Sequence, residues 1–197
     1  TGPQVSTSLE SVAEYTTVYR TTAPERIQRD GQNIFANNND GSEYYDRGRV
    51  ANEFKLTSEL HVRTDQDGLF VRGTAWYDTQ IMDHGPSGEA FAGHRARLLD
   101  AYLYTNRYLG EMPVSLRLGR QVINWGEGIY YADGLNVINP VDIGRVVLPN
   151  ASFKDALLPT NMLSGQLGLT DQLSLEAFYG LEFQGHELIP TGAFLNN

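Results

Sequence analysis

The most regular feature of the chain is an alternation of apolar and polar residues over positions 50–63. A β-strand sends successive side chains to opposite faces, so this segment has one apolar and one charged face. Strands of soluble domains have about 5–6 residues, whereas a transmembrane β-strand needs about 9–11, with lipid on one side and water on the other. The apolar face consists of Val50, Phe54, Leu56, Leu60 and Val62, and the polar face of Glu53, Lys55, Thr57, Glu59, His61 and Arg63. The length of this segment and its division into an apolar and a polar face together predict a membrane-spanning strand.

The same kind of signal recurs along the chain. Further strands are expected at 4–20, 69–78, 95–108, 114–122, 161–169 and 173–183. Short turns connect alternate pairs of strands, and the turn at 65–68 contains the Asp and Gly residues that hairpins favour. Long loops at 21–48 and 79–94 separate these hairpins. This alternation of short turns with long loops is typical of an up-and-down outer-membrane barrel.

We therefore predict an all-β fold, an antiparallel up-and-down transmembrane outer-membrane β-barrel. Seven strands are expected in residues 1–197, whereas closed single-chain bacterial barrels have an even number, from about eight upward. The chain is thus expected to be a single, incomplete barrel domain, the N-terminal fragment of a longer barrel. A soluble β-sandwich is the alternative. It would require the long strands to be broken and the apolar face of 173–183 to be buried by protein instead of lipid.

Residues 123–160 interrupt the strand pattern. This segment is too long and too apolar for a simple exposed loop, and loops of this length are usually functional or packed against the rest of the fold. We expect an irregular, inward-folding, plug-like segment with a short helical turn at 152–158.

Composition narrows the class of protein further. The hydrophobic content is 41%, and no apolar run approaches the ~18 residues that a membrane-spanning helix needs. A barrel is expected to lack such runs as well, because half of the residues in each of its strands are polar. The net charge of −9 argues against a nucleic-acid partner. The absence of cysteine excludes disulfides and thiolate metal sites.

Alternation along each expected strand assigns side chains to a lipid face or to the lumen. On 95–108, Leu99, Ala101 and Leu103 are expected to face lipid. The lumen is expected to be lined by Glu53, Lys55, Glu59, Arg72, Asp78, Asp100, Arg117, Gln121, Glu176 and Glu182.

Arg120 does not fit this assignment. Strict alternation directs it outward, where a charge near the middle of the membrane would cost about 2–4 kcal/mol. We favour a bulge at Gly119 that turns it inward to pair with Glu127 or Asp142, so that the pair, together with Trp125, anchors 123–160. The resulting element is either a charged constriction that selects solutes or a structural ion pair that holds a plug, and both interpretations stay open.

No catalytic or metal-binding constellation is apparent. An EF-type calcium loop with Gly41 at its sixth position would have Asn38 and Asp40 as ligands, but Ala36 and Arg47 at the first and last positions do not fit. The four histidines lack zinc-type spacing. The Gly-Pro-Ser-Gly-Glu stretch at 85–89 falls short of a nucleophile elbow. We therefore expect no enzyme activity, no cofactor and no metal.

Several blocks of sequence resemble a known family. They are residues 39–48, 57–60, 68–73, 98–102, 116–127, 134–142, 154–159 and 173–179. The most specific are Arg-Gln at 120–121 with Trp-Gly-Glu at 125–127, and Asn-Pro-Val-Asp at 139–142. Together they are similar to the proteobacterial outer-membrane β-barrel family catalogued as domain of unknown function 1302 (DUF1302). The resemblance implies an exported barrel, longer than this chain, associated with resistance-nodulation-division-type envelope transport and with the handling of hydrophobic compounds.

The expected function is that of a passive channel or export conduit in the bacterial outer membrane for small amphiphilic or hydrophobic compounds. The alternative is a closed barrel that serves as a scaffold or docking partner of an envelope transport complex. Expected surroundings are outer-membrane lipid and lipopolysaccharide, and periplasmic or resistance-nodulation-division-type components are the candidate protein partners. A hydrolase is the weakest hypothesis, because no nucleophile and base are paired in the sequence.

Overall fold

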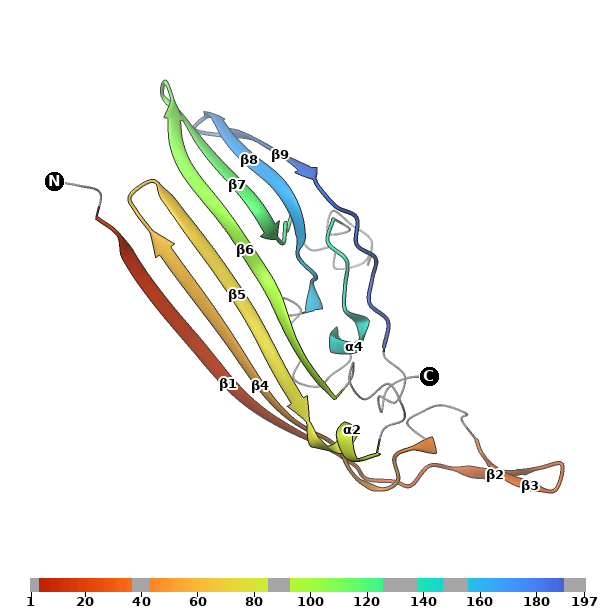
Figure 1. The fold of residues 1–197 in the computed structure, drawn as a ribbon. Coiled ribbons are helices and arrows are strands. Elements are labelled where there is room, and N and C mark those ends of the chain that lie inside the picture. The colour runs from red at the N-terminus through yellow and green to blue at the C-terminus, as the bar shows by residue number, and fades with distance from the viewer. Residues whose placement is uncertain (1–3, 37–42, 85–92, 126–137, 147–155, 190–197) are drawn as a thin grey trace.

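The structure is a computed structural model that describes residues 4–36, 43–84, 93–125, 138–146 and 156–189. Seven long strands form one antiparallel sheet in the order β1-β4-β5-β6-β7-β8-β9, which curves around the short helix α4 (Figure 1). The strands are β1 Ser6–Arg20, β4 Gly48–Arg63, β5 Asp67–Asp78, β6 His94–Leu109, β7 Met112–Gln121, β8 Thr160–Thr170 and β9 Leu173–Gly180. The remaining elements are β2 Arg26–Arg29, β3 Gln32–Phe35, α2 Thr79–His84 and α4 Ile143–Val146. The prediction of an all-β antiparallel fold is confirmed.

Each long strand pairs with the next long strand along the chain. The β4–β5, β6–β7 and β8–β9 pairs are joined by short turns at one end of the sheet, and the long connections lie at the other end (Figure 1). Within the described ranges β1 and β9 are the two edges, so the sheet is not closed. No helix among the described residues is long and apolar enough to cross a membrane.

Two predicted loops contain regular structure. The 21–48 loop holds the β2–β3 hairpin, which projects away from the main sheet (Figure 1). Asp30 and Gly31 at its tip have φ angles of 53° and 78°, the positive values that a two-residue type I′ turn requires. In the 79–94 loop, Asp78 caps α2 by accepting hydrogen bonds from the backbone N–H groups of Gln80 and Ile81. Local capping and turn residues thus add structure that the long-range strand pattern does not predict.

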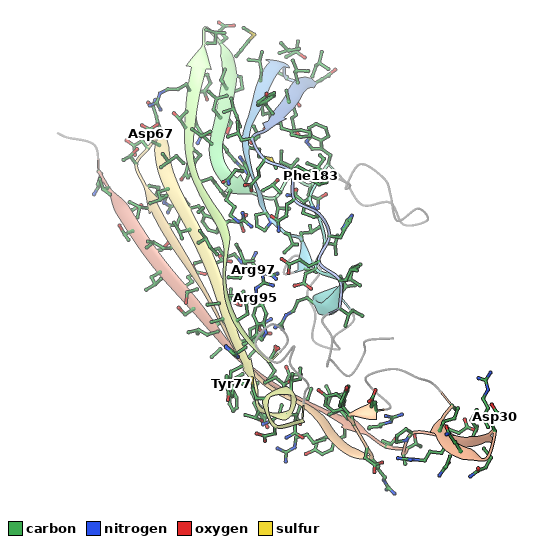
Figure 2. The ribbon with its side chains drawn as sticks, turned by 45° about the vertical axis from the view of Figure 1, so that its right-hand side comes forward. Asp30, Asp67, Tyr77, Arg95, Arg97 and Phe183 are labelled. Atoms are coloured by element: carbon green, nitrogen blue, oxygen red, sulfur yellow. The ribbon has the colours of Figure 1, made fainter. Side chains whose placement is uncertain are left out.

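The pairing register divides the sheet into two faces. Phe54 is aligned with Tyr15 on β1 and Tyr77 on β5, and we call their side the outer face. Glu53 is aligned with Thr16 and Asp78 on the opposite side, the inner face. Figure 2 shows Tyr77 directed away from the side to which Arg95 and Arg97 point.

The outer face is apolar and exposed. From the row of Tyr15, Phe54 and Tyr77 to the row of Val62 and Leu69, no outer position of β1, β4 or β5 carries a charge. Exposed apolar side chains continue across the sheet, including Leu98, Leu103, Leu116, Leu118, Leu163, Leu175 and Tyr179. Buried apolar residues lie instead on the side of α4, among them Trp76, Leu99, Ala156, Leu158 and Met162.

The assignment of Leu99 to the lipid face is wrong. The β5–β6 register shifts between Val71 and Gly73, where Leu99 and Asp100 of β6 both lie opposite Arg72, so β6 contains one additional residue. As a result Leu98 takes the outer position, 51% exposed, and Leu99 is 2% exposed. A single bulge reverses the faces, because side chains alternate with a period of two.

The predicted bulge at Gly119 is also absent. The β6–β7 register runs without interruption through Leu118–Leu103, Gly119–Tyr102 and Arg120–Ala101, which leaves Arg120 on the outer face. Gly119 has a φ of 133°, and a Cβ there would lie 2.4 Å from the carbonyl oxygen of Ala101. Glycine is needed at 119 because the β6 backbone comes too close for a side chain.

We expect Gly119→Ala to destabilise the fold by about 1–3 kcal/mol or more, because it adds both backbone strain and a collision with β6. Gly110→Ala is the matched control, since Gly110 also has a positive φ of 67° but a Cβ added there would have no atom within 4 Å. Urea-induced unfolding of both variants measures the difference. Equal losses for the two would contradict the close-approach explanation.

Candidate functional site

The inner face carries a group of buried and half-buried arginines and carboxylates where residues 138–146, the α4 segment, cross it. We call this the anchor cluster: Glu53 of β4, Trp76 of β5, Arg95 and Arg97 of β6, Asp142 and Arg145 of the α4 segment, and Glu187. Figure 2 shows Arg95 and Arg97 directed toward the α4 segment. The cluster therefore joins the sheet to residues that are distant in sequence.

Arg97 is at the centre of the anchor cluster. Its Nη1 donates to Asp142 Oδ2 at 2.9 Å, and its Nη2 donates to Glu187 Oε2. Arg95 reaches the same Glu187 oxygen at 2.8 Å. The side chains of Arg97 and Asp142 are only 8% and 9% exposed, so this pair is largely withdrawn from water. Charges so placed are tolerated only when each is compensated by a partner.

Arg145 makes the second connection. Its Nη1 donates to both carboxylate oxygens of Glu53, at 2.9 and 2.7 Å. Its guanidinium carbon lies 3.7 Å from the centre of the Trp76 ring, which is cation–π stacking at short range. Asp142 also accepts hydrogen bonds from the backbone N–H of Arg145, so one carboxylate both caps α4 and pairs with β6.

Backbone and amide hydrogen bonds fix the position of the same segment. Val141 forms a bridge with Leu157, and Asp142 forms one with Glu187. The side chain of Asn139 accepts from the Ile123 N–H at 2.8 Å and donates to the carbonyls of Gln121 and Leu158. Asn139 is only 1% exposed, so no bulk water can replace these partners.

We expect Asn139→Ala to cost about 1–3 kcal/mol, because it leaves buried backbone groups without a hydrogen-bond partner. Asn139→Asp is the informative second variant, since it retains the acceptor for the Ile123 N–H but cannot donate. Resistance to urea, followed by tryptophan fluorescence, measures both. Unchanged unfolding midpoints would contradict a structural role for Asn139.

The predicted lumen residues lie on the inner face with one exception. Lys55 pairs with Glu14 at 2.6 Å, and Arg72 lies 3.1 Å from Glu59 and 3.7 Å from Asp100. Asp78 is used to cap α2, and Gln121 is 1% exposed with its amide bonded to the carbonyl of Met162 and the hydroxyl of Ser164. The inner-face positions are Glu53, Lys55, Glu59, Arg72, Asp78, Asp100, Arg117, Gln121 and Glu176.

Glu182 is the exception, and of the two predicted partners of Arg120 the prediction of Asp142 is wrong. Strand β9 ends at Gly180 instead of continuing to 183, so alternation does not determine where Glu182 points. Its carboxylate accepts from Asn161 and lies 3.4 Å from Arg120 Nη1. Asp142 pairs with Arg97 and not with Arg120. Glu127 lies outside the described residues. The outward charge is therefore compensated by a carboxylate beyond the strand end.

The most important partners were missed by the sequence analysis. Arg95 and Arg97 are two residues apart on one strand and therefore share a face, but strict alternation from Ala101 and Leu103 places that face toward lipid, and only the β6 bulge reverses it. Arg145 and Glu187 lie in irregular segments with no periodic pattern, and Arg145 is 92 residues from Glu53. Nothing local in the sequence connects them.

An exposed ion pair at the turn end provides a contrast to the anchor cluster. Arg107 Nη2 donates to both oxygens of Asp67 at 2.9 Å, with 46% and 53% of the two side chains exposed. Hydrogen bonds from Arg107 and Thr105 lower the pKa of Asp67, so this pair persists as the pH falls into the usual carboxyl range.

Metal binding finds no support in the described ranges. No group of three or more histidine, aspartate or glutamate side chains there is arranged to hold an ion. The Asn38, Asp40 and Gly41 loop considered for calcium lies outside the described residues.

Comparison with protein families gives a match over residues 1–197 to the family described as "Protein of unknown function (DUF1302)". No curated protein and no solved structure matches the chain.

Proposed function

The chain belongs to the DUF1302 family, and we propose that it forms part of an outer-membrane β-barrel that acts as a passive channel or export conduit for small amphiphilic or hydrophobic compounds. The observation that carries this proposal is the division of the sheet into an exposed apolar face and a charged one. A soluble sheet with this arrangement would need a second protein layer over its outer face. A lipid bilayer provides the same cover without one.

The dimensions of the outer face support a membrane setting. Along β4 the apolar side runs from Phe54 to Val62, which is roughly 26 Å at about 3.3 Å per residue. A strand tilt of about 40° leaves roughly 20 Å along the membrane normal, close to the ~25 Å apolar band of outer-membrane barrels. Tyr15, Phe54 and Tyr77 form an aromatic row at the loop end, and the first two rings are 4.7 Å apart. Such aromatic rows are typical of the membrane–water interface.

The inner face supports a water-accessible but narrowed interior. Acidic and basic side chains pair across neighbouring strands of this face, from β1 to β6, which suits an aqueous lining. The anchor cluster holds the α4 segment against this lining, so the segment would occupy part of the lumen of a closed barrel. Charged constrictions of this kind select solutes by size and charge.

The test is single-channel conductance of the purified full-length protein in a planar bilayer across a salt series. Discrete current steps that grow with salt concentration are the expected result. Their absence from a protein that is demonstrably folded would contradict a passive channel.

A closed scaffold is the second candidate function. It is favoured by the tight packing behind the α4 segment, where Ala156 and Leu158 are both 0% exposed. If this packing completes a plug, the folded protein conducts no current, and its partners, for which resistance-nodulation-division-type components remain the candidates, bind at the turns or loops.

A further inference from the structure

A small pocket lies on the inner face between β7, β8, β9 and the segment 122–125, away from the anchor cluster. Its volume is about 210 Å³, below the ~300–1,000 Å³ of pockets that hold drug-sized ligands, so it suits a molecule with a single ring. The residues used below are Ser115, Arg117, Trp125, Gln166, Glu176 and Phe178, the last of which contacts Trp125 at its rim.

Two rows of the sheet form the floor of this pocket. Arg117, Ser164 and Phe178 are aligned across β7, β8 and β9. Ser115, Gln166 and Glu176 form the neighbouring row. The floor therefore has a cation and hydrogen-bond donors on the β7 side.

Arg117 differs from the other inner-face bases in its surroundings. Lys55, Arg72, Arg95 and Arg97 each have a carboxylate within 4.0 Å. In the part of the chain that the structure describes, Arg117 has none, and its guanidinium instead lies over the Tyr102 ring, 5.5 Å from the ring centre. A guanidinium presents several donors in a plane that matches a carboxylate.

The opposite wall is aromatic. Trp125 lines the pocket together with Arg117 and Ser164, and its ring is in edge-to-face contact with that of Phe178 at a centroid distance of 5.3 Å. Such a wall favours a flat apolar body. Glu176 lies two strands away from Arg117, so its charge repels an anionic end and directs it toward β7.

We propose that this pocket binds a small aromatic carboxylate, with the carboxylate on Arg117, Ser115 and Gln166 and the ring against Trp125. This inference rests on the proposed function, because the conduit is the route by which such a solute would reach the pocket. It also names the class of compound that the conduit accepts. Binding itself is measured independently of transport.

The experiment is ligand-observed NMR titration of the folded, full-length protein with phenylacetate, with its neutral isostere phenylacetamide and with acetate. We expect saturable binding of phenylacetate that is at least tenfold tighter than binding of either comparison compound. Arg117→Gln should weaken phenylacetate binding at least tenfold, and Arg117→Lys should weaken it less. Arg107→Gln removes an exposed arginine outside the pocket and should leave the affinity unchanged. Trp125→Ala should weaken phenylacetate and leave acetate unaffected.

Equal binding of phenylacetate and phenylacetamide would overturn the proposal, as would unchanged affinity in Arg117→Gln. Tighter binding of phenethylamine than of phenylacetate would place recognition on Glu176 and would also overturn it. Conductance of the same preparation separates the two proposals: current steps without phenylacetate binding contradict only the pocket, and binding without current contradicts only the open channel.

Discussion

Arg97→Gln is expected to destabilise the protein by about 3–5 kcal/mol, because it leaves the buried carboxylate of Asp142 without a cation and leaves Glu187 paired with Arg95 alone. The matched control is Arg107→Gln at the exposed pair with Asp67, where little or no change in stability is expected. Urea unfolding of the two variants in the same detergent measures the contrast.

The same substitution should also change conductance. Loss of the Arg97 pairs weakens the attachment of the α4 segment to β6, so larger or more variable current steps are expected if the segment occupies the lumen. A second variant that adds Asp142→Asn to Arg97→Gln removes the uncompensated charge. It should recover part of the lost stability but not the original conductance. A loss below about 1 kcal/mol in Arg97→Gln would contradict the anchoring role.

Leu98→Arg on the outer face is expected to cost about 2–4 kcal/mol if this surface contacts lipid, because Leu98 is aligned with Gly73, midway between the rows of Phe54 and Val62. In a protein whose outer face is in water, the same change at a side chain that is 51% exposed would change stability by at most about 0.5 kcal/mol. The size of the stability loss therefore distinguishes a membrane barrel from a soluble sheet.

Asn106→Arg provides the matched control on the same strand. Asn106 is exposed and is aligned with Ser115, so it belongs to the inner face. A charge there should be nearly neutral in either environment. Folding efficiency into lipid vesicles and urea midpoints of both variants give the comparison. Equal, small effects of Leu98→Arg and Asn106→Arg would argue against lipid contact.

Sequence patterns predict the sheet well because the signal is local. Alternation within β4 and β5, with the turn between them, determines both strands and their pairing without distant residues. The same local rule fails where one residue is inserted. The bulge at Leu99–Asp100 depends on how β6 packs against β5 and the buried core, and neither neighbour is evident from the strand itself.

The candidate site is less predictable because its partners lie far apart in the chain. Alternation correctly places Glu53 on the inner face but gives no indication that Arg145 would meet it. The outward direction of Arg120 follows from strict alternation, and a bulge is predicted there only because an outward charge near the middle of the membrane would be costly. Glu182 provides it from beyond the end of β9, where alternation no longer applies.

The strand order of the sheet allows it to assemble by local steps. Every long strand lies beside the long strand that precedes or follows it in the chain, so no pairing has to wait for a distant part of the sequence. The entropy lost in closing each connecting loop grows only slowly with loop length, and the three tight turns keep it small for half of the pairings. The sheet can therefore grow one hairpin at a time from either edge, and a strand that is added late does not require earlier pairs to separate.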